Sequence, residues 1–364
     1  MAGFGFGFGF SPHGALLNQI KGFTTEWNLT DNTTAGRTVT LPLVNTRAEG
    51  ALSYNCIVDW GDGVVSTITS YNSANRIHEY SSIGVKTIEI KGICEGWSFN
   101  NGGDKLKITK ILDFGNPDVF HGFKYLKSGF YGCTNLSQIP ANGGFIASGT
   151  GIGLDGFNAT FRDCTSLASL PVDLFRYNTL VSTNGFNATF QNCTSLASLP
   201  VDLFRYNTAV STSGFQNTFY GCTSLTTLPV DLFRYNTAVS TSGFNSTFRG
   251  CTSLASLPEY LFRYNTAVST NGFYSTFYGC TKLTLNENIF CDSATERTTR
   301  FLNRTSHFGN CFYRASFDGS QGIAPDLWNY SFGSVTPTST GCFGSSGNSI
   351  TSLSNYNDIP ANWK

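Results

Sequence analysis

The sequence predicts an α/β solenoid, built from repeats of about 29 residues and preceded by a small all-β sandwich. Three observations carry this prediction: a cysteine recurs at a fixed spacing, four central units are nearly identical, and the N-terminal third alternates β-prone segments with turns. A fixed period of this kind is the sequence signature of stacked repeats. The expected organisation is a Gly-Phe leader (1–21), a sandwich (22–94), a junction with an N-terminal cap (95–125), the repeat solenoid (126–290), and irregular repeats with a C-terminal cap (291–364).

Eight of the eleven cysteines mark the repeat, because they recur at intervals of 31, 29, 29, 29, 29, 31 and 31 residues. Residues 193–221 and 222–250 are identical at 24 of 29 positions. Spacing this regular favours stacked units over a disulfide framework or a zinc motif, so we expect these cysteines to pack in the core as small apolar side chains. They are Cys133, Cys164, Cys193, Cys222, Cys251, Cys280, Cys311 and Cys342.

Each unit places apolar residues at helical spacing. In the first central unit Phe157, Phe161, Cys164 and Leu167 are four, three and three positions apart. This spacing predicts one buried face of a short helix, and residues 173–177 are expected to form a single helical turn further on. One unit cannot bury that face alone, so neighbouring units must stack and share a continuous core.

The repeated pattern F-x-x-C-T-S-L-x-x-L-P-x-x-L-F resembles the BspA-type leucine-rich repeats of bacterial surface proteins. The resemblance covers residues 126–290 strongly and 291–364 weakly. It implies a leucine-rich-repeat-like α/β solenoid and a role in adhesion or partner binding.

The N-terminal third contains several β-prone segments separated by turn residues, which predicts a small β-sandwich. The W-G-D-G run at 60–63 and the H-x-Y-x-x-x-G run at 78–84 resemble signatures of PKD-like domains over about 70 residues. In the first run, Asp59 and Asp62 either bond nearby backbone amides of a tight turn or bind calcium, since hard cations prefer clustered oxygens. The predicted strands are residues 38–41, 54–58, 64–68 and 86–90.

The leader alternates glycine with phenylalanine. In an extended chain Phe4, Phe6, Phe8 and Phe10 would lie on one face with only glycine on the other. An exposed stripe of this kind would be adhesive, so one hypothesis is that it docks on a partner or joins subunits by strand addition. The other hypothesis is a disordered tail.

Composition argues against several classes of protein. Charge is balanced, with 23 Lys+Arg against 23 Asp+Glu, so we expect no nucleic-acid partner. No apolar run is long enough to span a bilayer, and the N-terminus has no secretory signal. The four histidines and the remaining cysteines form no recognisable metal or nucleophile motif, so we expect no catalytic residues, no bound metal and no cofactor.

An arginine and a tyrosine recur together in each central unit and form the main candidate binding stripe. Arg and Tyr dominate binding hot spots, so the stripe suits a carbohydrate or a protein surface. The structural alternative is that Asp173, Asp202, Asp231 and Glu259 in the same units compensate the arginine charges. The stripe residues are Arg176, Tyr177, Arg205, Tyr206, Arg234, Tyr235, Arg263 and Tyr264.

Positions beside the Phe pair vary between units and supply a second set of candidates. Such variation fits a binding surface, and drift on a solvated face would produce the same pattern. These residues are Arg162, Tyr220, Arg249, Tyr274 and Tyr278.

Together these features predict a non-enzymatic structural or adhesion protein that presents a repeat surface to a protein or glycan on a host or virion surface. The leading version is a bacteriophage virion component, made in the cytoplasm and released by lysis, as a head or tail decoration or fibre. It docks or forms homo-oligomers through its leader. The alternative is a bacterial cell-surface or secreted leucine-rich-repeat adhesin, and a remote one is an enzyme with a site in the sandwich.

Overall fold

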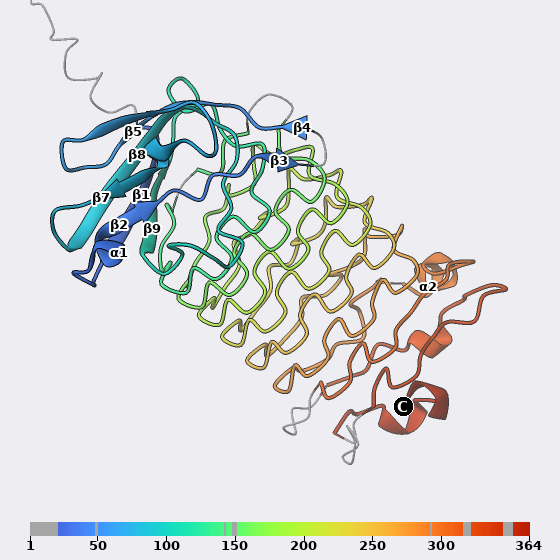
Figure 1. Ribbon diagram of the computed structural model, residues 1–364. Helices are drawn as coiled ribbons and strands as arrows, with labels where there is room; N and C mark the ends of the chain where they lie inside the picture. Colours follow the sequence, from blue (N-terminus) through green and yellow to red (C-terminus); the bar gives the residue numbers. More distant parts are fainter. Residues whose placement is uncertain are drawn as a thin grey trace, which may run out of the picture.

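The computed structural model describes residues 21–47, 50–141, 143–147, 151–291, 293–315, 322–344 and 352–364. A β-sheet lies at one end, the repeat units lie side by side behind it, and the C-terminal segments lie at the far end (Figure 1). The leader phenylalanines Phe4, Phe6, Phe8 and Phe10 fall outside the described residues. Within those residues, no helix combines the length and apolar character that a bilayer crossing requires.

The regular elements concentrate in the N-terminal third. The strands are β1 (Phe23–Leu29), β2 (Thr38–Thr40), β3 (Thr46–Arg47), β4 (Gly50–Ala51), β5 (Tyr54–Asp59), β6 (Val65–Ile68), β7 (Ile77–Glu79), β8 (Gly84–Cys94) and β9 (Ile108–Phe114). The α-helices are α1 (Thr34–Arg37) and α2 (Ala294–Thr299). Short 3-10 turns are η2 (Ala74–Arg76), η3 (Leu327–Asn329), η4 (Tyr356–Asp358) and η5 (Ala361–Trp363).

The main sheet is open and antiparallel, with strand order β6-β5-β8-β1-β9. Separate two-stranded pairs join β2 to β7 and β3 to β4. The four predicted strand segments correspond to β2, β5, β6 and β8. Strand β5 alternates buried and exposed residues, as expected for a strand with one face on the core.

The prediction of an α/β leucine-rich-repeat-like solenoid is wrong. Across the described repeat units, residues 151–290 contain no helix, and α2, the one α-helix beyond them, is six residues long. The expected helices at Phe157–Leu167 and at residues 173–177 are series of turns. The leucine-rich-repeat description fails with them, because that architecture needs a regular strand and a helical or 3-10 segment in each unit.

Left-handed residues explain why the apolar spacing does not form a helix. Asp155, Ala159 and Asp163 have φ of 55°, 55° and 59°, so every fourth residue leaves the α-helical region. Alternate amides bond three residues back, as Thr160 N does to Phe157 O at 3.1 Å. The amides between them bond to the next unit, as Phe161 N does to Thr189 O at 2.8 Å. A period of four produced by turns thus imitates the 3.6-residue period of a helix.

Three columns of phenylalanine run through the core. Equivalent rings in adjacent units are nearly parallel, with Phe186 and Phe215 at 5.6 Å and an interplanar angle of 5°. Offset stacking of this kind adds about 0.5–1.5 kcal/mol per pair beyond the burial of area. The first column contains Phe157, Phe186, Phe215, Phe244, Phe273 and Phe308; the second Phe130, Phe161, Phe190, Phe219, Phe248, Phe277, Phe312 and Phe343; the third Phe175, Phe204, Phe233, Phe262 and Phe290.

Each phenylalanine column has its own ladder of buried side-chain hydrogen bonds. Thr218 Oγ1 donates to Phe186 O at 2.7 Å, and Cys222 Sγ donates to Phe190 O at 3.1 Å. We call the third ladder the asparagine ladder, and its later members bond the preceding unit twice: Asn236 Nδ2 donates to Phe204 O at 3.1 Å and to Asn207 O at 2.9 Å. Its first member, Asn178, makes one such bond, to Phe145 O at 2.8 Å. Its described asparagines are Asn178, Asn207, Asn236 and Asn265.

The C-terminal register differs from the one predicted by counting cysteines. Phe308 and Phe312 stack on Phe273 and Phe277 at 5.7 and 5.5 Å, so they are the Phe pair of this unit. Cys311 therefore takes the place of the buried threonine, and Ala315 takes the cysteine place. The 31-residue interval from Cys280 to Cys311 reflects that substitution, because the stacked phenylalanines Phe277 and Phe312 are further apart in the chain than those of the central units.

Strand β9 joins the sheet to the repeat units. It pairs with β1 at the sheet edge, and on its other side Ile111 N donates to Gln138 O at 3.0 Å. Aromatic contacts follow the same route, from Phe23 to Phe123 at 5.1 Å. One apolar core, rather than two, therefore runs from β1 to Trp363 near the last described residue.

Removing one rung of the asparagine ladder should destabilise the protein. We expect Asn236→Ala to lower the free energy of unfolding by about 1–3 kcal/mol, because two buried carbonyls each lose one of their two hydrogen bonds and keep only the bond from a backbone amide. Urea unfolding followed by circular dichroism measures the change. The half-exposed Asn187→Ala is the control and should change stability by less than about 0.5 kcal/mol. Equal effects of the two substitutions would contradict the assigned role.

Candidate functional site

The predicted arginine and tyrosine stripe is a continuous ladder in the structure. Arg205 lies between its own Tyr206 and Tyr235 of the next unit, with guanidinium-to-ring distances of 5.8 and 5.5 Å. Arg176 and Arg234 repeat this arrangement. We call the eight residues from Arg176 to Tyr264 the Arg–Tyr stripe: Arg176, Tyr177, Arg205, Tyr206, Arg234, Tyr235, Arg263 and Tyr264. Each exposed cation–π contact contributes about 0.5–1 kcal/mol, so the side chains hold one another in place.

Acidic side chains compensate the stripe, in three units with the acid that the structural alternative named and in the fourth with Glu296 in place of the predicted Glu259. Asp173, Asp202 and Asp231 lie 3.3–3.4 Å from the arginine three positions later. The hydrogen bond that Arg234 donates to the Asp231 carboxylate raises the pKa of Arg234. The last arginine, Arg263, pairs with Glu296 of α2 at 3.0 Å. The stripe is therefore rich in donors and aromatic surface while its net charge stays small.

Exposed valines accompany the stripe, and the sequence analysis missed them. Val172, Val201 and Val230 precede the stripe acids by one position and are 54%, 61% and 65% exposed. An apolar side chain kept exposed in three successive units adds hydrophobic surface to the polar ladder. The valine recurs in the repeated P-V-D-L-F-R-Y sequence. A repeated apolar residue is usually taken as part of the core, so nothing in the sequence indicated that this valine lies on the surface.

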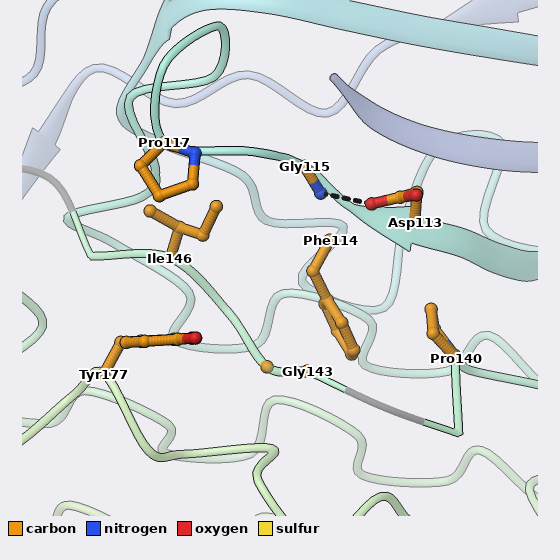
Figure 2. Close-up of a pocket in the computed structure, with 9 residues that line it drawn as sticks. Asp113, Phe114, Gly115, Pro117, Pro140, Gly143, Ile146 and Tyr177 are labelled. Carbon is orange, nitrogen blue, oxygen red and sulfur yellow. Dashed lines mark hydrogen bonds between the residues drawn. The ribbon is translucent and has the colours of Figure 1, made fainter. Parts of the chain in front are cut away.

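A pocket of about 160 Å³ lies at the N-terminal end of the stripe. It brings Tyr177 together with Phe114 from the end of β9 and with Pro117, Pro140 and Ile146 (Figure 2). The Asp113 carboxylate accepts a hydrogen bond from Gly115 N at 2.9 Å, so it shapes the turn after β9. The pocket walls combine aromatic and aliphatic side chains with polar surface from Asp113 and the backbone, which suits a ring that also carries polar groups.

A second set of candidates forms another column on the repeat units. Arg249 contacts the rings of Tyr220 and Tyr278 at 5.7 and 4.4 Å, and Arg162 contacts Tyr131 at 5.0 Å. These side chains are half-buried against one another. They offer less free surface than the Arg–Tyr stripe.

Tyr274 is separate from both columns. Its ring is 37% exposed, and its hydroxyl accepts a hydrogen bond from Asn310 Nδ2 at 3.3 Å. The structure therefore does not bring Tyr274 together with the other sequence-predicted binding residues.

Asp59 and Asp62 bond to the turn that contains them. Asp59 Oδ1 accepts from Gly61 N at 2.8 Å, and Asp62 Oδ1 accepts from Val64 N at 3.2 Å. Asp62 Oδ2 lies 2.8 Å from His78 Nε2; burial raises and this bond lowers the pKa of Asp62, with a net decrease. Among the described residues no group of three or more His, Cys, Asp or Glu is placed to hold a metal ion.

All eleven cysteines are buried thiols, which confirms the core position predicted for the eight repeat cysteines. The surroundings differ from the prediction, since the repeat cysteines of the central units donate to a turn carbonyl of the preceding unit rather than lying on a helix face. Burial raises the pKa of Cys222 to about 12. A thiol of this kind is a poor nucleophile because little thiolate forms near neutral pH.

No protein-family model matches the chain, and no match was found among curated proteins. The resemblance to BspA-type repeats therefore has no family match behind it, and the turn-built units contradict the architecture it implied. The PKD-like resemblance of residues 58–84 stays a prediction.

The buried thiols should be unreactive in the folded protein. At about pH 8 we expect an aromatic disulfide reagent to label the native thiols slowly, because all eleven are buried away from the reagent. In denaturant all eleven should react quickly, which serves as the control. Rapid labelling of a thiol in the native protein would reveal an accessible thiolate that the structure does not contain.

Proposed function

We propose that this protein is a non-enzymatic binding protein whose Arg–Tyr stripe attaches to a polymer made of repeated units, in particular a surface polysaccharide. The observation that carries the proposal is the regular exposure of one Arg–Tyr pair per unit. In the third phenylalanine column, next to the stripe in the sequence, ring centroids of neighbouring units are 5.8–6.1 Å apart. The Arg–Tyr pairs therefore recur at a short and regular interval from unit to unit.

A periodic surface favours a periodic ligand for an energetic reason. The first contact bears the entropy cost of association, so each further unit that contacts the same ligand adds to the affinity at little extra cost. Contacts that are weak individually therefore give a useful overall affinity. The stripe supplies guanidinium donors, phenol hydroxyls and apolar surface in fixed register, and its cation–π contacts pre-organise the side chains. A globular protein partner would need no such repetition.

Tyrosines inside and outside the Arg–Tyr stripe should differ in their contribution to polysaccharide binding. We expect the full chain to bind polysaccharides on a glycan array, and the double variant Tyr206→Ala/Tyr235→Ala to bind about ten-fold more weakly or worse, as for hot-spot residues. Tyr131→Ala is the matched control, because Tyr131 also contacts an arginine, Arg162, yet lies outside the stripe. Unchanged binding by the double variant, or no polysaccharide ligand at all, would refute the proposal.

The setting of this function is a second part of the proposal. We propose that the leader, residues 1–21, anchors the protein to a virion or a bacterial surface while the stripe faces outward. Its support is the alternating Gly-Phe sequence, which would place all four phenylalanines on one face of an extended strand.

Deleting residues 2–10 separates anchoring from binding. We expect the truncated chain to keep its polysaccharide affinity and to lose its retention on particles or its self-association, because an apolar docking stripe has been removed. Sedimentation of the protein with purified particles, and analytical ultracentrifugation of the protein alone, measure the two properties. Unchanged retention and assembly state would eliminate the anchoring role.

A further inference from the structure

The asparagine ladder ends at an arginine. In the regular units, Asn265 Nδ2 donates to Phe233 O and Asn236 O at 3.0 Å each. In the next unit Arg300 makes the equivalent pair of bonds, because its Nη2 donates to Phe262 O at 2.9 Å and to Asn265 O at 3.1 Å. The guanidinium of Arg300 thus makes the two hydrogen bonds that a neutral amide side chain makes in the other units.

This replacement leaves a buried charge without a full set of partners. Arg300 is 6% exposed, and its Nε and Nη1 atoms have no hydrogen-bond partner among the described residues. Burial lowers the pKa of Arg300 to about 10. Its guanidinium lies 4.6 Å from the ring of Phe301, which compensates part of the cost. A buried guanidinium charge is energetically costly unless an anion or a hydrogen-bond acceptor pairs with it.

A pocket of about 210 Å³ opens beside this residue. Three arginines line it together with a single carboxylate, and that carboxylate, Glu296, is 3.0 Å from Arg263. The lining residues Thr266, Thr299 and Arg304 are exposed, so the pocket is reached from solvent. The full lining is Arg263, Thr266, Glu296, Thr299, Arg300 and Arg304.

The pocket also continues the Arg–Tyr stripe. Arg263 is the last arginine of the stripe and a wall of the pocket, so a chain lying along the stripe reaches the pocket at its C-terminal end. The pocket at the other end, shown in Figure 2, is lined by Phe114, Pro117, Pro140 and Tyr177 and carries no arginine. The two ends therefore differ in chemistry, and the arginine-lined end selects negative charge.

We propose that this pocket binds a compact anionic group, a carboxylate or sulfate, carried by the polysaccharide that lies on the Arg–Tyr stripe. This assignment rests on the proposed function and places the ligand in the class of acidic polysaccharides. Arg304 supplies an exposed guanidinium for the anion, Thr266 and Thr299 supply hydroxyl groups, and the anion neutralises the charge of Arg300. Charge-assisted hydrogen bonds to guanidinium groups are the strong ones in proteins.

The pocket itself is tested with inorganic sulfate and the full chain. Sulfate is added at constant ionic strength while the arginine Nε–H resonances of ¹⁵N-labelled protein are followed. We expect saturable shifts, and at least about ten-fold weaker binding by Arg304→Gln, an exposed position whose loss leaves the core intact. Arg205→Gln, which removes a stripe arginine outside the pocket, should bind sulfate like the unmodified chain. No saturable shift, or equal loss in both variants, overturns the proposal.

The ligand class is tested with a matched pair of oligosaccharides, one acidic and one with its carboxyl groups reduced to alcohols. We expect the acidic form to bind at least about ten-fold more tightly, and Arg304→Gln to remove that preference without weakening the neutral form. If both forms bind equally and only Tyr206→Ala/Tyr235→Ala weakens them, the proposed function stands and the acidic assignment falls. If sulfate binds but neither oligosaccharide does, the polysaccharide function fails while the anion pocket itself stands.

Discussion

The structure depends on the satisfaction of carbonyl groups that a backbone made of turns leaves buried. A helix or a sheet would pair these groups within its own regular bonding, but here alternate amides bond within a turn and the others bond to the next unit. Side chains of the following unit, in the threonine, cysteine and asparagine ladders, add a second hydrogen bond to carbonyls that already accept one from a turn amide. Each ladder bonds to the carbonyls of one phenylalanine column. The side-chain hydrogen bonds and the ring stacking therefore fix the same register between neighbouring units.

That register is transmitted to the surface. Because Asn207 and Phe204 are fixed in the core, Arg205 and Tyr206 beside them must emerge at the same place in every unit. The guanidinium of one unit then reaches the ring of the next at 5.4–5.6 Å. The regularity of the Arg–Tyr stripe is thus a consequence of the core. The Arg–Tyr stripe ends next to Arg300, where the asparagine ladder of the core changes from an amide to a guanidinium.

Sequence reasoning reached the repeat period, the core residues and the stripe, and it failed on the backbone. Phe157, Phe161 and Cys164 are buried as expected, but their four-residue spacing reflects successive turns with left-handed residues such as Ala159. A single alanine gives no local signal for positive φ, so the helix was the natural prediction. Counting cysteines also misplaced Cys311, because a thiol and a threonine hydroxyl fill the same buried site and only ring stacking identifies the register.

Several features could be read from the chain without its fold: the 29-residue period, the identity of most buried residues, and the pairing of Arg176, Arg205 and Arg234 with an aspartate three positions earlier. These follow from composition and spacing, which are local properties. The fold alone shows how the units bond to one another, that β9 merges the sheet with the repeat units, and that Arg300 completes the asparagine ladder beside a pocket. Each of these features depends on hydrogen bonds between residues far apart in the chain, about one repeat unit apart within the array and further still between β1 and β9, and no local pattern specifies such partners.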